Sequence, residues 1–203
     1  VKLTIPLDAK PFEKEFRGIN SEVYTYYEAF TSDMLYGMED RLIFPIRNVV
    51  GDIKIFIGRD LFSDGKKKYK FYPAGISPPL FPAIPRPYKS SVFLVEGIFD
   101  ALNLIDKGIL NVICCFGTNT ITESTFSRLG YLNLMGANKF YILFDGDEAG
   151  YKAGAKLEKL INSKGLWSQQ ISLPEGLDPG QFTKDQAEEL KETVYENSIS
   201  WKN

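Results

Sequence analysis

The 203-residue sequence contains no histidine and only two cysteines. Cys114 and Cys115 are adjacent within an apolar run at residues 112–116, where a free Cys behaves as a small buried hydrophobe. A zinc site or a disulfide framework therefore has almost no side chains to build on. No apolar run approaches the ~20 residues that a membrane-spanning helix needs, and no signal peptide is visible at the start. We therefore expect a globular protein in the cytoplasm.

The net charge is small, but the charges are unevenly distributed along the chain. The net charge is −2. Residues 1–89 contain 14 Lys and Arg against 11 Asp and Glu, a balance of +3, and residues 90–203 contain 10 against 15, a balance of −5. A basic part beside an acidic part suits a polyanion that is held near a metal site.

The first part of the chain, residues 1–89, is predicted to be a small basic α+β subdomain. A short helix is expected within residues 16–30, and two strands at 41–46 and 53–58 are joined by a turn at Gly51-Asp52. Residues 73–87 contain six prolines and cannot form a regular helix or a central strand. We expect this stretch to connect two subdomains.

The second part, residues 90–203, alternates between apolar strands and helices. This alternation predicts βαβ crossovers and an α/β domain with a parallel sheet of about four strands, flanked by helices. The expected strands are 92–95, 112–116, 140–144 and 169–173, and the expected helices are 98–107, 122–135, 148–163 and 184–197.

Acidic residues follow three of these strands. Glu96 follows the first, Asp145 and Asp147 follow the third, and Asp178 follows the fourth. In open parallel sheets, ligands bind outside the carboxyl ends of the strands, so these carboxylates should converge. Clustered carboxylates raise one another's pKa and favour bound cations, and oxygen ligands suit Mg²⁺ or Mn²⁺. The sequence therefore predicts a metal-dependent phosphoryl-transfer site.

Two neighbouring residues are expected to support this site, and each acidic motif also has a simpler explanation. Gly97 would allow a sharp turn after the strand, and Asp100 lies one helical turn further on. Glu96 and Asp147 could merely cap helices, and the sequence at 178–180 could be an ordinary turn. Capping explains Asp145 poorly, because this residue follows five apolar residues. The combination is more specific than any one member.

Cations and aromatic side chains are mixed in the first subdomain. Arg47, Arg59, Lys68 and Tyr69 could meet nucleic-acid phosphates with positive charge and bases with a ring face. The alternative is a solvated basic loop beside core aromatics, and the sequence alone leaves both open.

Together these motifs resemble the Toprim domain, which is shared by bacterial-type primases, type IA and II topoisomerases and some nucleases. Residues 91–182 carry the resemblance: Glu96 matches the family glutamate, and Asp145 and Asp147 match its D-x-D pair. The sequences at 41–46, 57–61 and 68–69 are similar to the segment that precedes Toprim in bacterial and phage primases. The chain thus resembles the RNA polymerase core of such a primase.

This resemblance implies a nucleotidyltransferase that makes short RNA primers on a DNA template. Glu96, Asp145 and Asp147 would be catalytic and, with Asp178, would hold two Mg²⁺ or Mn²⁺ ions, while Asp100 and Gly97 would support them. DNA or NTP phosphates would be bound by the four residues of the basic subdomain, Arg47, Arg59, Lys68 and Tyr69. Implied partners are single-stranded DNA, NTPs, a replicative helicase and a zinc-binding domain outside this chain. The source would be a bacterium or a phage.

The sequence departs from the family pattern at residue 180. Primases often have Asp-Pro-Asp where this chain has Asp178-Pro179-Gly180, so one possible ligand is missing. No GxxxxGK[ST] loop is present, which argues against a fused helicase motor. Two other functions fit the same motifs: a Toprim nuclease that cleaves phosphodiesters, and a catalytically silent Toprim-like module that binds DNA or a helicase.

Overall fold

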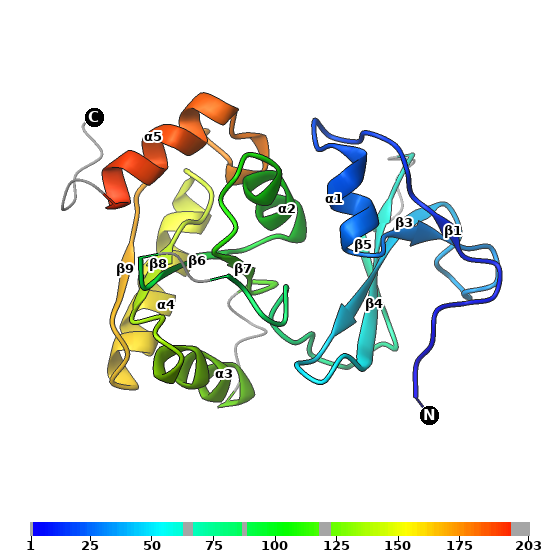
Figure 1. Ribbon diagram of the computed structural model, residues 1–203, viewed down its shortest axis with the longest axis horizontal. Coiled ribbons are helices and arrows are strands. Elements are labelled where there is room, and N and C mark those ends of the chain that lie inside the picture. The colour runs from blue at the N-terminus through cyan, green and yellow to red at the C-terminus, as the bar shows by residue number, and fades with distance from the viewer. Residues whose placement is uncertain (1, 63–66, 87–88, 118–122, 196–203) are drawn as a thin grey trace. The chain divides into compact units, whose positions relative to one another are not determined.

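The computed structural model describes residues 2–62, 67–86, 89–117 and 123–195 (Figure 1). The chain divides into two compact units, Val1–Pro79 and Leu80–Asn203. This division falls inside the proline-rich segment, and the domain boundary after residue 89 stays a prediction. Among the helices described, none is both long enough and apolar enough to span a membrane.

Unit 1 is built on a five-stranded antiparallel sheet with one short helix. The strands are hydrogen-bonded in chain order, and the predicted hairpin is confirmed as β3 and β4. The helix α1 is shorter than the sequence suggests, because Tyr27 and Glu28 already leave the helical path. The elements are β1 (Lys10–Pro11), α1 (Ser21–Tyr26), β2 (Phe30–Thr31), β3 (Arg41–Arg47), β4 (Ile53–Asp60) and β5 (Tyr69–Tyr72).

The sheet of unit 1 is buried on both faces. Met38, Ile43 and Phe56 belong to a cluster on one face, and the N-terminal segment packs against it. On the other face, the ring of Tyr24 from α1 lies 6.3 Å from the ring of Phe44. Because both faces are covered, β3 and β4 read as nearly continuous apolar runs in the sequence.

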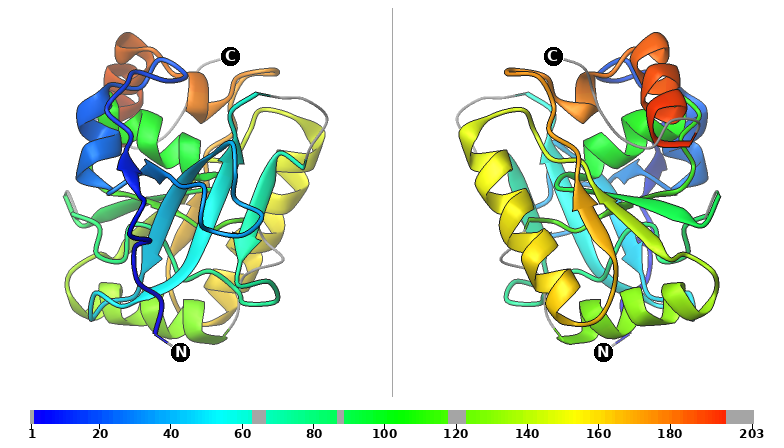
Figure 2. Two further views of the ribbon diagram at one scale, coloured as in Figure 1. Left: turned by 90° about the vertical axis from the view of Figure 1, so that its right-hand side faces the viewer. Right: turned by 90° about the vertical axis from the view of Figure 1, so that its left-hand side faces the viewer.

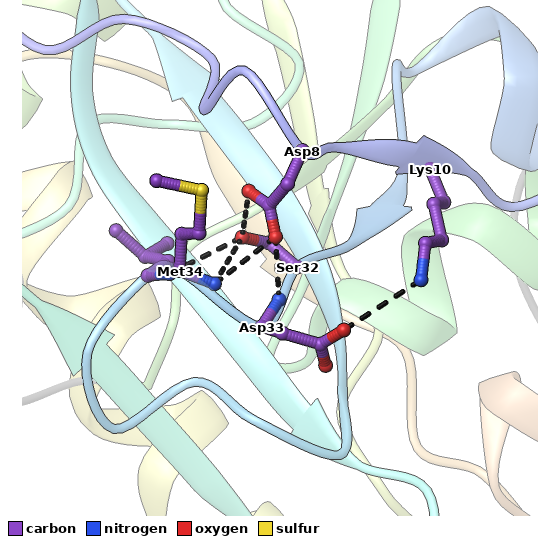
Figure 3. A network of polar contacts seen from close by, with 6 residues as sticks. Asp8, Lys10, Ser32, Asp33 and Met34 are labelled. Carbon is purple, nitrogen blue, oxygen red and sulfur yellow. Dashed lines mark hydrogen bonds and ion pairs between the residues drawn. The ribbon is translucent and has the colours of Figure 1, made fainter.

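The N-terminal segment is attached to the turn after β2 by one carboxylate (Figure 3). Asp8 accepts the Ser32 hydroxyl at 2.8 Å and the backbone N–H groups of Asp33 and Met34 at 2.8 and 3.0 Å. Lys10 adds an exposed ion pair with Asp33 at 3.6 Å, which contributes little by itself. Asp8 therefore satisfies three donors of the turn and fixes the edge of the sheet.

Unit 2 contains the four-stranded parallel sheet that the sequence predicts, in the order β7-β6-β8-β9. Each expected helix is present in the described residues, and α4 begins and ends where the sequence places it. Thr122 and residues 196–197, included in two of the expected helices, lie outside the described residues. The elements are β6 (Ser91–Val95), α2 (Ile98–Asp106), β7 (Val112–Cys114), α3 (Glu123–Leu134), β8 (Lys139–Ile142), α4 (Glu148–Ser163), β9 (Ser168–Gln170), η2 (Pro179–Gln181) and α5 (Lys184–Tyr195).

Helices cover both faces of this sheet (Figures 1 and 2). Leu129 of α3 and Leu157 of α4 join a buried cluster with Leu94 and Ile142 of the central strands. Phe93 points to the opposite face, where its ring lies 6.2 Å from that of Tyr195 in α5. This three-layer arrangement leaves the carboxyl ends of β6 and β8 side by side, and the acidic residues follow these ends.

Candidate active site

Three carboxylates meet beyond the carboxyl ends of the central strands. Asp145 lies three residues after β8, Asp178 is the N-cap directly before η2, which follows β9, and Asp100 lies in the first turn of α2 after β6. One oxygen from each of these residues lies within 4.8 Å of the others. All three side chains are partly buried. The sequence predicts only a supporting role for Asp100, whereas the structure places its carboxylate within this group.

Glu96 and Asp147 lie beside this triad. Glu96 directly follows β6 and is partly buried, and Asp147 precedes α4 and is exposed. Burial and the charge of Asp147 raise the pKa of Glu96. The two carboxylates therefore lie close enough to interact electrostatically. All five acidic residues singled out in the sequence of unit 2 therefore contribute negative charge to one region of its sheet.

Backbone N–H groups orient several of these carboxylates. Asp100 Oδ2 accepts from Gly97 N at 2.7 Å, Asp178 Oδ1 from Gly180 N at 2.7 Å, and Asp147 Oδ1 from Gly150 N at 2.6 Å. The cap considered for Asp147 and the turn considered at 178–180 are therefore both present. Each of these backbone bonds uses one oxygen of its carboxylate, and the second oxygen of Asp178 accepts a longer bond from Gln181 Nε2 at 3.5 Å.

Gly146 is required for close approach between two loops. The backbone turns tightly at Gly146, because Asp147 N donates to the Asp145 carbonyl oxygen at 2.8 Å, although φ of Gly146 lies outside the left-handed region. The Gly146 N–H donates to Leu177 O at 2.8 Å, and its carbonyl oxygen accepts from Gly176 N at 2.8 Å. A Cβ on Gly146 would lie 2.1 Å from the Pro174 carbonyl oxygen. The loop at 174–177 therefore lies directly against the Asp145–Asp147 motif and places Asp178 nearby.

Gly97 and Gly180 are also packed against carboxylates. Gly97 lies in the bend that leads from β6 into α2 and is the N-cap of this helix, with an extended backbone (φ −104°, ψ 155°). A Cβ there would lie 2.8 Å from Asp100 Oδ2. A Cβ on Gly180 would lie 2.9 Å from Asp100 Oδ1 and 3.0 Å from Asp178 Oδ1. The glycine found at the third position of the Asp-Pro-Gly turn thus lets these two aspartates come close together.

The electrostatics of the triad favour a bound cation. Burial, followed by the charges of Asp178 and Asp145, raises the pKa of Asp100 from its ordinary value of 3.8 to about 7. A carboxylate in such surroundings is stabilised in its charged form by a nearby positive charge. Opposite ligands of Mg²⁺ are about 4 Å apart, because each oxygen lies at 2.0–2.1 Å from the ion. The spacing of the triad and its all-oxygen chemistry therefore fit Mg²⁺ or Mn²⁺.

The two cysteines lie under this site and are not ligands of it. Both are buried and in the thiol form, without a disulfide, as the sequence predicts. Burial and the charge of Glu96 raise the pKa of Cys115 to about 12, so the thiol stays protonated. The Cys114 thiol donates to the Glu96 carbonyl oxygen at 3.3 Å and accepts from Phe116 N at 3.4 Å. Cys114 therefore connects the loop after β7 to the end of β6.

The candidate phosphate-binding residues of unit 1 do not form one group. Arg59 and Tyr69 are paired across β4 and β5, with the guanidinium 5.0 Å from the ring centroid, and exposed Lys68 directly precedes Tyr69. Arg47 lies at the other end of the β3–β4 hairpin. There it forms a two-pronged ion pair with Glu28 at 2.7 and 2.8 Å. The structure therefore brings Arg59, Lys68 and Tyr69 together and gives Arg47 a different partner.

Comparisons with known proteins agree with this architecture. Residues 93–183 match a family model described as Toprim-like. The chain is 33% identical over 165 residues to the DNA primase of Aquifex aeolicus, covering 76% of this chain and 32% of that protein. It spans a third or less of the length of the curated relatives it matches.

Solved structures show the same fold over nearly the whole chain. The zinc-binding and RNA polymerase domains of the Aquifex aeolicus primase superpose with a TM-score of 0.75 at 27% identity, covering 90% of this chain and 54% of that chain. A DnaG primase catalytic domain bound to single-stranded DNA gives a TM-score of 0.67 at 22% identity, covering 91% and 69%. In fold and sequence the chain is therefore similar to the RNA polymerase domain of DnaG-type DNA primases, and it contains a Toprim-like segment.

Proposed function

We propose that this chain is the catalytic core of a DNA primase and joins ribonucleotides into short primers on a DNA template. The observation that carries the proposal is the triad of Asp100, Asp145 and Asp178, with Glu96 and Asp147 beside it, at the carboxyl ends of β6 and β8. Its similarity to a DNA primase over three quarters of the chain supports the same activity.

The acidic residues are proposed to hold two divalent cations. Asp100, Asp145 and Asp178 would hold one ion, and Glu96 and Asp147, which lie close enough to influence each other's charge, would contribute to a second. Such a pair of ions, when bound, activates an attacking hydroxyl and neutralises the leaving pyrophosphate. The backbone donors of Gly97 and Gly180 would keep two of these carboxylates in a fixed orientation.

Template and nucleotide phosphates are proposed to bind the cations of unit 1. Arg59 and Tyr69 lie on adjacent strands, and Lys68 directly precedes β5. Together they combine positive charge with a ring face, a mixture that suits single-stranded DNA. Arg47 stays a predicted phosphate ligand, and it would have to break its ion pair with Glu28 to bind a phosphate. Single-stranded DNA is the ligand in one of the similar primase structures.

Further partners and the setting are also proposals. A zinc-binding domain accompanies the polymerase domain in the Aquifex aeolicus structure, and we propose that a corresponding domain acts with this chain. A replicative helicase partner, a cytoplasmic setting and a phage or bacterial source stay predictions of the sequence resemblance.

Extension of a preformed RNA primer tests the proposed chemistry without a separate template-recognition domain. The chain would be incubated with a short RNA annealed to a longer DNA strand, labelled NTPs, and Mg²⁺ or Mn²⁺. We expect elongated RNA that disappears with EDTA. Asp145→Asn should abolish extension while leaving the melting temperature close to that of the wild type or above it, because the substitution removes a charge from a crowded cluster.

A surface carboxylate of the same unit provides the matched control. Glu123 forms an exposed ion pair with Lys164 beyond the end of α4, whereas Asp147 caps the start of this 16-residue helix, a separation of about 24 Å. Glu123→Gln should therefore extend the primer at the wild-type rate. Shortened DNA in place of elongated RNA would identify a nuclease, and DNA binding without either product would identify a silent module. Full activity in Asp145→Asn would remove Asp145 from the site.

A further inference from the structure

Asn103 is a polar residue in the apolar part of α2. Its side chain is only 2% exposed, and its neighbours Ala101, Leu102 and Leu104 are buried hydrophobes. An amide in such a position is costly unless its hydrogen-bonding groups are satisfied. The sequence gives no chemical motif that explains it, since it lies outside the acidic motifs. Its partners therefore indicate what it does.

The Asn103 amide holds the turn that follows Asp178. Its Nδ2 group donates to the carbonyl oxygens of Pro179 at 2.9 Å and Phe182 at 3.0 Å. Both partners are acceptors, so the amide nitrogen must face them and both of its hydrogens are used. These carbonyls belong to the first residue of η2 and to the residue just after it. Asn103 thus ties both ends of η2 to α2.

The two elements joined by Asn103 carry two of the three triad members. Asp100 lies three residues before Asn103, one turn earlier on α2, and Asp178 is the N-cap residue directly before η2. Gly180, in the middle of η2, approaches Asp100 so closely that a Cβ would lie 2.9 Å from its Oδ1 atom. The distance between the Asp100 and Asp178 carboxylates therefore depends on how firmly η2 is held against α2.

We propose that Asn103 is a positioning residue for the cation site: by fixing η2 on α2, it sets the spacing of Asp100 and Asp178. The inference rests on the proposed function, because it assumes that the triad binds a divalent ion. Residues that orient metal ligands without touching the metal typically contribute 10–100-fold in metal affinity. Asn103 would act in this way through the backbone of η2.

A second buried asparagine provides a matched control at the other end of the same sheet. Asn111 is also 2% exposed, and its Nδ2 donates to the Ser91 carbonyl oxygen at 3.0 Å and to the Ser91 hydroxyl at 3.1 Å. Ser91 begins β6 and Asn111 precedes β7, so both lie at the amino ends of the strands. Asn111→Ala therefore removes a similar buried amide far from the carboxylates.

The test measures binding of Mn²⁺ alone by electron paramagnetic resonance, together with the melting temperature. Asn103→Ala and Asn103→Leu, the second of which keeps the branched shape of the side chain without its hydrogen-bonding groups, should weaken Mn²⁺ binding by about 10–100-fold. Asn111→Ala should lower the melting temperature to a comparable extent and change the Mn²⁺ affinity by less than about twofold, because its contacts are remote from the ligands. Asp145→Asn should abolish binding at this site.

The four variants separate the possible outcomes. If the wild type binds no Mn²⁺, or if Asp145→Asn binds it as the wild type does, the proposed cation site itself fails. If Asp145→Asn loses the ion but the Asn103 variants bind it as tightly as Asn111→Ala, the site stands and the positioning role is overturned. If neither Asn103 variant melts cooperatively while Asn111→Ala does, Asn103 supports the fold itself, and the positioning role is also overturned.

Discussion

Asp100 links the stability of the chain to pH. Its pKa is about 7 in the folded protein, because it is buried near Asp178 and Asp145, against an ordinary value of 3.8. Between these two values the folded state holds a proton that the unfolded state has released. The contribution of Asp100 to the free energy of unfolding is therefore greatest below pH 3.8. It falls as the pH rises toward 7, by roughly 1.4 kcal/mol per pH unit at most. Burial and Asp147 raise the pKa of Glu96, which acts in the same direction.

Asp100→Asn should remove this pH dependence in the metal-free protein. Asn keeps an oxygen that can accept from Gly97 N but carries no charge to repel its neighbours. In EDTA, the variant should melt at a higher temperature than the wild type at pH 7.5, and the difference should shrink toward pH 4. Thermal denaturation across this range measures the effect.

Addition of Mg²⁺ should reverse the order of the two proteins. A ligand that binds only the folded state stabilises it by mass action, and the ion should stabilise the wild type more than Asp100→Asn, and more at pH 8 than at pH 5. The surface variant Glu123→Gln should follow the wild type throughout. Identical pH slopes for Asp100→Asn and the wild type without metal would show that Asp100 does not titrate in this window.

At the scale of elements, the two loops that form the acidic site depend on contact at Gly146. Gly146→Ala would place a Cβ 2.1 Å from a backbone atom, the Pro174 carbonyl oxygen, so one loop must move. We expect a loss of roughly 1–3 kcal/mol in the free energy of unfolding, as for other overpacked sites. Mn²⁺ affinity should also fall, because the loop at 174–177 leads to Asp178. Urea denaturation and Mn²⁺ titration measure the two effects.

Gly130 provides the control for a glycine substitution in the same unit. It lies inside α3, and a Cβ there would have no neighbour within 4 Å. Gly130→Ala should stabilise the protein by about 0.5–1 kcal/mol, since Ala favours a helix interior, and leave Mn²⁺ affinity unchanged. Equal behaviour of the two alanine variants would show that close approach at Gly146 is unimportant.

Most elements of unit 2 could be predicted, because their signals are local. Apolar strands alternate with helices that begin at good caps, such as Asp147 before α4. Strand ends were harder: β7 stops at Cys114 and β8 at Ile142, two residues before the apolar runs end. Hydrophobicity indicates burial and not where a strand ends: Cys115 and Phe144 stay buried beyond their strands, and Cys115 N still donates to Val95 O at 2.9 Å. The short strands β1 and β2 carry no local signal and depend on tertiary contacts such as those of Asp8.

The acidic site was predictable in its composition but not in its arrangement. The rule that parallel strands end at one edge placed Asp145 and Asp178 correctly in one region. The position of Asp100 depends on how α2 begins, with Gly97 N donating to its carboxylate. The spacing from Glu96 to Asp100, four residues across a strand–helix junction, is the signal that could have indicated it. Asn103 has no such signal, because its partners lie more than 70 residues away in sequence.

At the scale of the whole molecule, each unit has its own sheet and its own buried cluster. Unit 2 buries 13 residues in one cluster around β6 and β8, and the triad and its orienting donors all belong to this unit. Unit 1 contains the cations proposed to bind phosphates. Unit 2 should therefore fold and bind the cation without unit 1, whereas binding of DNA should require unit 1.

Residues 80–203, produced separately, should melt cooperatively and keep the Mn²⁺-dependent rise in melting temperature, because the ligands and their supports are retained. This part carries 12 Lys and Arg against 15 Asp and Glu, so it should bind single-stranded DNA far more weakly than the full chain.

In the full chain, replacing Arg47, Arg59 and Lys68 with Gln should reduce the slope of log affinity against log salt by about 2, since each phosphate contact to a single strand contributes about 0.7. Fluorescence anisotropy with a labelled oligonucleotide measures both. An undiminished DNA affinity of residues 80–203 would locate the template-binding surface within the Toprim unit and remove it from the β4–β5 strands.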